Sequence, residues 1–355
     1  MFDDELIRIV GDHLGVPVTF VSRPSPISGG FWASIHGFEI TGGPDGWNRP
    51  LVLRVMPDRA AGVRETVVQR TVAEQGFPTP PVLASGVDGA LGGAYIVMPR
   101  AAGSSPMPRL DLGRSLLHLP SALRSLPGQL ADVVVRLHAL DPAPVAAALA
   151  ELDPDEVPGG GHGLERRLRS IRAVGDLDIA GASTFVELAD WLDAHRPGVM
   201  TAPAVADAMV VSHGDIHPFN LLIDDAGAVT VLDWTNANLL PREFDVGFTA
   251  GLLRCAPISV PRLVRPLLRR LTGWLAEAFV ERYAAAAPLD HTAVAWFEAL
   301  QYGRCLAELA VSRAGSGASI GADHPFETSA AAMVRRLHTL TTVAIILPPR
   351  PAPAS

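Results

Sequence analysis

The chain has 355 residues, 48% of them hydrophobic and 19% charged, which excludes a disordered protein and is enough for two packed lobes. Its formal net charge of −8 at pH 7 disfavours nucleic acid as a partner and is compatible with a cationic substrate. With two cysteines, an acidic first segment and no apolar run near the ~18 residues of a membrane helix, we expect a cytoplasmic protein with no membrane partner.

The first hundred residues have the pattern of a small sheet with one main helix. Apolar residues at helical spacing predict helices over 2–14 and 60–75. Apolar runs rich in β-branched residues predict strands at 18–22, 31–40, 51–56, 82–86 and 94–98. Together these segments predict a five-stranded lobe.

From residue 101 onward the pattern becomes mainly helical. Residues 101–127 are rich in proline, serine and glycine and predict a loop-dominated crossing, which leads into a helix that ends near His138. The repeated proline, alanine and glycine of 141–162 are typical of a connector. Further helices are predicted over 163–174, 183–195, 246–256, 262–285, 290–312 and 327–343, with a frayed tail at 348–355.

The most informative segment is a loop after an apolar strand, followed by a hairpin. Asp215 lies in the loop, and Asn220 comes five positions later. Two short apolar runs, 221–223 and 229–233, flank a turn and predict a hairpin that ends at Asp233. The hairpin would carry the amide and the second carboxylate to one rim.

These residue types suit phosphoryl transfer. A loop carboxylate can accept the proton of an attacking hydroxyl, provided that it sits within hydrogen-bond reach. Mg²⁺ prefers oxygen ligands and takes only one or two carboxylates beside the phosphate oxygens. We therefore predict Asp215 as the catalytic base, and Asn220 and Asp233 as ligands of Mg²⁺. Protein kinases place an Asp, an Asn and a second Asp in the same order.

At these residues the chain resembles a known family. His213-Gly214-Asp215 with Asn220, followed by Leu232-Asp233-Trp234, resembles the aminoglycoside phosphotransferase and choline-kinase-like small-molecule kinases. Weaker similarity covers 76–83, 136–141 and 191–197, and the resemblance extends over roughly residues 15 to 285. It implies an α+β, bilobal, protein-kinase-like fold. A small antiparallel β N-lobe with one main helix would span 1–100, and a larger, mostly helical C-lobe would span 101–347.

The resemblance also implies that ATP binds under the N-lobe. The turn that contains Ser28, Gly29 and Gly30 would offer backbone N–H groups to phosphate, although such a turn is also generic. Met98 lies in the segment that would contact the adenine, although a methionine here is also typical of a core. Asp245 and His213 would brace the catalytic loop as buried, structural residues.

Every basic residue of the chain is arginine, because no lysine occurs. With the high alanine, glycine and proline content, this indicates a GC-rich bacterial genome. A kinase normally places lysine on its third strand to hold the α- and β-phosphates, and Arg54 occupies that position here. Arginine can grip phosphate with two N–H groups, so the role can survive. Glu65 is the candidate ion-pair partner of Arg54; the alternative is that it solvates an exposed helix face.

The reaction implied is transfer of the ATP γ-phosphate to a hydroxyl of a small molecule, such as an aminoglycoside, a macrolide, a sugar or an amino alcohol. A nucleotide-binding pseudokinase is one alternative, supported only by Arg54. A metal-dependent phosphoesterase that uses His213, Asp215 and His217 is a weaker one, because the further histidine clusters of those enzymes are missing after residue 221. No motif identifies the acceptor.

Overall fold

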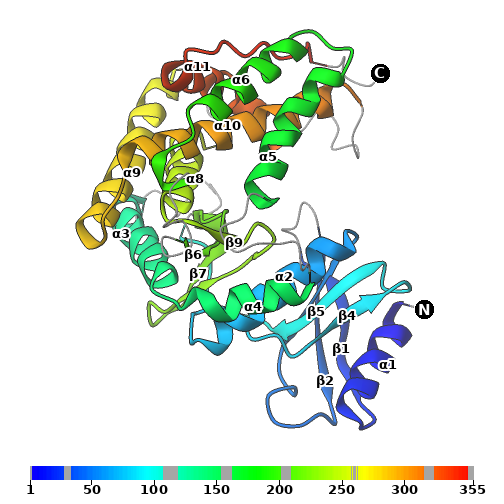
Figure 1. The fold of residues 1–355 in the computed structure, drawn as a ribbon. Helices are drawn as coiled ribbons and strands as arrows, with labels where there is room; N and C mark the ends of the chain where they lie inside the picture. The colour runs from blue at the N-terminus through cyan, green and yellow to red at the C-terminus, as the bar shows by residue number, and fades with distance from the viewer. Residues whose placement is uncertain are drawn as a thin grey trace. The chain divides into compact units, whose positions relative to one another are not determined.

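The computed structural model describes residues 2–27, 33–106, 119–152, 162–200, 209–256, 258, 261, 263–315 and 324–350. The chain forms two compact units (Figure 1). The first, the sheet unit, consists of Met1–Leu110, Leu140–Asp155 and Pro218–Ala237. The second, the helical unit, consists of Asp111–Ala139, Glu156–His217 and Asn238–Ser355. The lobe boundaries expected from the sequence stay a prediction.

The sheet unit is built on a five-stranded antiparallel sheet with the strand order β1-β2-β3-β5-β4. Its strands are β1 (Thr19–Pro26), β2 (Ser34–Thr41), β3 (Leu51–Met56), β4 (Ala84–Asp88) and β5 (Gly93–Pro99). The helices α1 (Phe2–Leu14) and α2 (Arg59–Glu74) accompany it. This architecture confirms the α+β class and the small antiparallel lobe with one main helix.

The central strand and the main helix fix the position of the first charged pair. In β3 the alternate residues Leu51, Leu53 and Val55 are buried, so Arg54 projects from the opposite face of the strand. Helix α2 lies close to β5, because a Cβ on Gly62 would be 2.6 Å from the Cβ of Ala94. A larger residue at position 62 would push the helix away from the sheet.

Two further pieces of chain belong to the sheet unit. The 3₁₀ turn Pro218–Asn220 leads into β7 (Leu221–Ile223), which pairs with β8 (Val229–Val231) in the hairpin expected from the sequence. The other piece is helix α4 (Pro142–Leu152), within the segment 141–162 that was expected to be a connector. That expectation was wrong, because proline fits the first position of a helix and Asp141 caps it by accepting from Ala143 N at 2.9 Å.

The helical unit contains a short strand pair and a helical core. Its strands are β6 (Met209–Ser212) and β9 (Asn238–Pro241), which pair antiparallel. Its helices are α3 (Leu119–His138), α5 (His162–Arg172), α6 (Ala182–Ala194), α8 (Glu243–Arg254), α9 (Arg265–Ala286), α10 (His291–Arg313) and α11 (Ala330–Thr341). Helix α3 begins at Leu119, so the end of the segment 101–127, which was expected to be loop-dominated, is helical.

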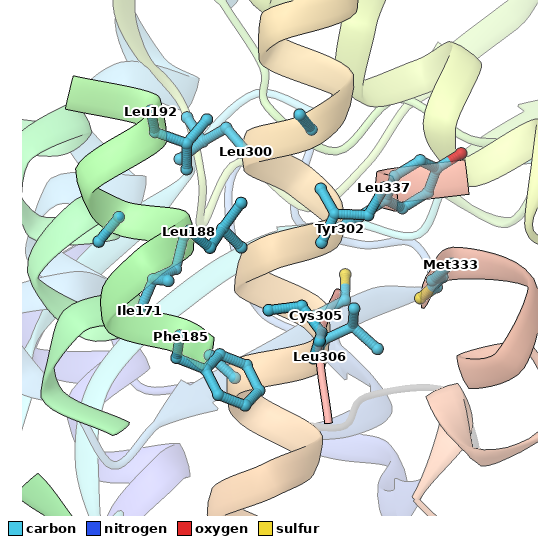
Figure 2. Packing of buried hydrophobic residues seen from close by; sticks show 14 of the residues in the cluster. Ile171, Phe185, Leu188, Leu192, Leu300, Tyr302, Cys305, Leu306, Met333 and Leu337 are labelled. Atoms are coloured by element: carbon cyan, nitrogen blue, oxygen red, sulfur yellow. The ribbon is translucent and has the colours of Figure 1, made fainter. Parts of the chain in front are cut away.

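The core of the helical unit lies around α10. Figure 2 shows side chains of α5, α6, α10 and α11 packed against one another, with α10 between α6 and α11. Among the described residues, no single helix is long and apolar enough to cross a membrane; Arg124–His138 and Pro142–Leu152 meet that length and composition only as a bent pair.

Candidate active site

A buried ion pair joins the sheet to its main helix. Arg54 of β3 and Glu65 of α2 are 7% and 1% exposed. The Nε atom of Arg54 lies 3.1 Å from Oε1 and 3.3 Å from Oε2 of Glu65. Glu65 is therefore the partner of Arg54, and the alternative of a solvated face is wrong. The contact to a nucleotide stays a prediction for both residues.

The same arginine also binds the carboxylate that follows the hairpin. Nη2 of Arg54 donates to Oδ1 of Asp233 at 2.9 Å. Asp233 has a φ of 67°, in the left-handed region that a residue with a Cβ rarely adopts. The guanidinium of Arg54 thus pairs with two carboxylates inside the sheet unit.

Neighbouring contacts hold Asp233 in this conformation. Trp234 is buried, and its indole N–H donates to Thr79 Oγ1 at 2.9 Å. On the other side, the backbone N–H of Leu232 donates to the carbonyl of Asn220 at 2.9 Å. This bond ties the segment of Asn220 to the segment of Asp233, so the two residues predicted as metal ligands share one end of the hairpin.

Burial and neighbouring charges act on both members of the Arg54–Glu65 pair. Burial raises the pKa of Glu65 to about 7, although Arg54 works in the opposite direction, and the charge of Asp233 raises it further. Burial opposes the charge of Arg54 as well, but Glu65 and Asp233 outweigh it and raise the pKa of the guanidinium. Burial and the charge of Asp233 thus disfavour a second full negative charge beside Arg54, and a bound cation would favour the ionised form of Glu65.

The donor set at this end of the hairpin suits Mg²⁺. Asn220 offers an amide oxygen and Asp233 a carboxylate, which are the hard oxygen ligands that Mg²⁺ prefers. The side chain of Asp233 is 32% exposed, so a hydrated ion can reach it from solvent. These two residues fit the metal that the sequence predicts.

In the helical unit, a buried carboxylate braces the loop that carries Asp215. Asp245 is fully buried at the start of α8, where Oδ2 accepts from His213 N at 2.9 Å and Oδ1 accepts from Gly214 N at 2.6 Å. Nε2 of His138 lies 3.0 Å from the same Oδ2. Asp245 therefore fixes the backbone immediately before Asp215, and His213 is itself buried there.

Asp215 lies close to His217, which the sequence pointed out, and near Arg304, which it did not. Its Oδ1 lies 3.6 Å from Nε2 of His217, and both side chains are about a quarter exposed. Arg304 of α10 is close enough for the charge of Asp215 to act on it: burial opposes the arginine charge, while Cys305, Glu308 and Asp215 raise its pKa. Nothing in the local sequence around Arg304 indicates this neighbourhood.

The remaining predicted residues contribute less. Met98 of β5 is buried, and Gln69 Nε2 lies 3.6 Å from its sulfur, so it is part of the packed interior and its contact with adenine stays a prediction. Ser28, Gly29 and Gly30 lie outside the described residues.

The two predicted roles fall in different units. Asp215 belongs to the helical unit, and the pair of Asn220 and Asp233 belongs to the sheet unit. Each half of the predicted machinery is thus built by its own unit. Within its unit, each half depends on a residue far away in the sequence, Asp245 for the loop and Arg54 for the hairpin.

A family model described as "Phosphotransferase enzyme family" matches residues 37–297, which is most of the chain. The chain belongs to the phosphotransferase enzyme family. No curated protein matches this phosphotransferase in sequence.

Solved structures share its kinase-like fold. A candidate aminoglycoside phosphotransferase from Ralstonia eutropha JMP134 aligns with a TM-score of 0.64 and 18% identity, over 97% of this chain and 99% of the other. A thermostable mutant of aminoglycoside phosphotransferase APH(4)-Ia was solved as a ternary complex with AMP-PNP and hygromycin B. It aligns with a TM-score of 0.58 and 17% identity, over 96% of this chain and 98% of the other. A macrolide 2'-phosphotransferase of type I aligns with a TM-score of 0.54 and 14% identity, over 97% of this chain and 96% of the other. At such identities the likeness concerns the fold alone.

Proposed function

We propose that this phosphotransferase moves the γ-phosphate of Mg·ATP to a hydroxyl group of a small molecule. The observation that carries the proposal is the cluster of Arg54, Glu65 and Asp233 at the end of the hairpin that also bears Asn220. It combines a buried guanidinium for phosphate with carboxylate oxygens for a cation. AMP-PNP and ADP bound to the structural neighbour APH(4)-Ia support a nucleotide as the phosphate donor.

Each residue then has one task. Asp215 accepts the proton of the acceptor hydroxyl while that oxygen bonds to the γ-phosphorus and the bond from phosphorus to the β–γ bridging oxygen breaks. Arg54 holds the phosphates, and Glu65 holds Arg54. Asn220 and Asp233 hold Mg²⁺, which when bound neutralises charge on the phosphate oxygens. Most of the rate enhancement comes from alignment and charge neutralisation.

The acceptor is a hydroxylated small molecule, from a class that includes aminoglycosides, macrolides, sugars and amino alcohols. Hygromycin B is bound by one structural neighbour, and another is a macrolide phosphotransferase. The acidic net charge of −8 suits a cationic acceptor.

The test is ³¹P NMR of the purified protein with Mg·ATP and a pooled panel of those four acceptor classes. We expect a new phosphomonoester resonance that disappears in Asp215→Asn, while thermal stabilisation by Mg·ATP persists in that variant. Full turnover by Asp215→Asn would refute the role of the base. Stabilisation by Mg·ATP without transfer would favour the pseudokinase, and hydrolysis of a phosphoester without ATP would favour the phosphoesterase.

A further inference from the structure

The hydroxyl of Thr235 lies at the centre of the charged cluster in the sheet unit. Its Oγ1 is 2.6 Å from Oδ1 of Asp233, 3.0 Å from Nη2 of Arg54 and 3.2 Å from Oε2 of Glu65. A single neutral side chain thus contacts both the predicted metal ligand and the pair predicted to hold phosphate. None of the roles described above assigns it a function.

The hydrogen bonds of this hydroxyl have one consistent direction. A guanidinium can only donate, so Thr235 Oγ1 accepts from Arg54. The hydroxyl has one proton, and the shorter separation, 2.6 Å against 3.2 Å, gives it to Asp233 rather than to Glu65. Asp233 Oδ1 therefore receives one hydrogen bond from Thr235 and one from Arg54.

This arrangement addresses a problem that the backbone creates. Asp233 sits at a positive φ directly after the hairpin, and its side chain is about one third exposed, so packing alone does not orient the carboxylate. When Asp233 ligates a metal, its attraction to Arg54 weakens, because the metal competes for the same oxygens. A β-branched hydroxyl residue has few rotamers, so it can keep both partners in place at a small entropic cost.

We propose that Thr235 is a positioning residue, whose hydroxyl orients Asp233 for Mg²⁺ and keeps Arg54 directed at the phosphates of the nucleotide. The inference rests on the proposed function, because it assigns Asp233 and Arg54 to a Mg·nucleotide. It adds that the metal ligand and the phosphate ligand are coupled through one neutral hydroxyl. A purely structural role would instead be to stabilise the chain after the hairpin, whether or not metal is present.

Two substitutions separate these roles. Thr235→Val keeps the shape and removes the hydroxyl, and Thr235→Ser keeps the hydroxyl and removes the methyl group. Calorimetric titration with ADP, once with Mg²⁺ and once with EDTA, measures binding without turnover. We expect Thr235→Val to weaken Mg·ADP about tenfold, the size of one charge-assisted hydrogen bond, and to weaken ADP in EDTA by less than about threefold. Thr235→Ser should bind Mg·ADP within about threefold of the wild type.

Several results would overturn the inference. Equal affinity of the wild type and Thr235→Val for Mg·ADP would do so, and so would equal losses with and without Mg²⁺, which indicate a structural role. If Thr235→Val does not fold, Thr235→Ala supplies a second variant without the hydroxyl, and the same outcomes apply to it. Failure of the wild type itself to bind Mg·ADP would refute the proposed function as well, so the two failures are distinguishable.

Discussion

Each unit contains a cluster of arginine and carboxylate side chains, and the two clusters differ in the number of arginines that face the carboxylates. In the helical unit, Glu298 of α10 is 3% exposed and accepts from Arg254 Nε at 3.2 Å and from both Nε and Nη2 of Arg336 at 2.9 Å. Arg254 also pairs with Glu277, so two arginines meet two carboxylates. In the sheet unit, the one guanidinium of Arg54 pairs with two carboxylates, those of Glu65 and Asp233.

This difference separates a structural cluster from one suited to a ligand. Glu298 joins α8, α10 and α11, and Tyr302 adds a hydrogen bond of 2.9 Å to the same carboxylate. Its charges are balanced by the protein itself. The cluster around Arg54 is buried at a cost, because burial and the charge of Asp233 raise the pKa of Glu65 to about 7. Cation binding would relieve this cost.

The largest effect is expected for Asp233→Asn, which tests whether the cluster around Arg54 binds a metal. The substitution removes the carboxylate predicted to bind the metal, but it leaves an amide oxygen to accept from Arg54. We expect kcat/KM for Mg·ATP to fall by about 10³-fold, while the free energy of unfolding stays equal or rises because repulsion of Glu65 is relieved. Steady-state kinetics and urea denaturation measure the two quantities. Activity within tenfold of the wild type would contradict the assignment.

Glu298→Gln makes the matched change in the helical unit. It leaves Arg254 and Arg336 beside a neutral amide, so we expect unfolding to become easier by about 3 kcal/mol. The KM for ATP should stay within about twofold, because the cluster is assigned no ligand. Urea denaturation and kinetics at a temperature where the variant is folded test this pair of expectations. A specific rise in KM would show that the two clusters are less distinct than proposed.

Replacing one arginine by lysine in each cluster tests whether the geometry of the guanidinium matters for ATP binding or only for stability. Arg54 uses Nε for Glu65 and Nη2 for Asp233, and a lysine ammonium cannot reproduce this planar geometry. Arg54→Lys should therefore raise the KM for ATP about tenfold. The control is Arg336→Lys, which should lower stability by about 1 kcal/mol and leave that KM unchanged. Equal effects of the two variants on KM would argue against a specific role of Arg54.

The smallest expected effect concerns pH. Glu327 accepts two hydrogen bonds from Arg313, at 2.7 and 2.8 Å, and these bonds lower its pKa below the ordinary 4.5. A carboxyl group with a lowered folded-state pKa stabilises the fold above its unfolded pKa, and this contribution is lost as the pH falls through the folded value. Glu327→Gln should therefore cost about 1 kcal/mol at pH 7 and almost nothing in strong acid. Urea denaturation from pH 7 to strong acid measures this cost in unfolding free energy. A cost that does not change with pH would contradict the expectation.

Local patterns were enough to predict one part of this molecule. The hairpin of β7 and β8 follows from two apolar runs around a turn, and it was predicted with its strands in nearly the observed places. The five-strand sheet and the main helix are confirmed for the same reason. The expectation of a connector at α4 is wrong, because proline breaks a helix in its interior but suits its first turn.

The contacts that define the site could not be predicted in the same way. Thr235 and Glu65 are 170 positions apart, and His138 and Asp245 are 107 apart. Their proximity is a product of tertiary packing: Thr235 belongs to no recognised pattern, and the family-like segment 136–141 gives no partner for His138. The Arg54–Glu65 pair could be predicted only because Arg54 lies on a strand and Glu65 lies in the first turns of the next helix.

The arginine at position 54 also determines which chemical probes can report on the nucleotide site. The chain has no lysine side chain, so nucleotide analogues that acylate a primary amine or form an imine have no side-chain target in it. Dicarbonyl reagents, which condense with guanidinium groups, do have one. Protection of Arg54 from such a reagent, mapped by mass spectrometry among the 29 arginines of the chain, would report occupancy of the site, whereas labels directed at a lysine side chain have no target.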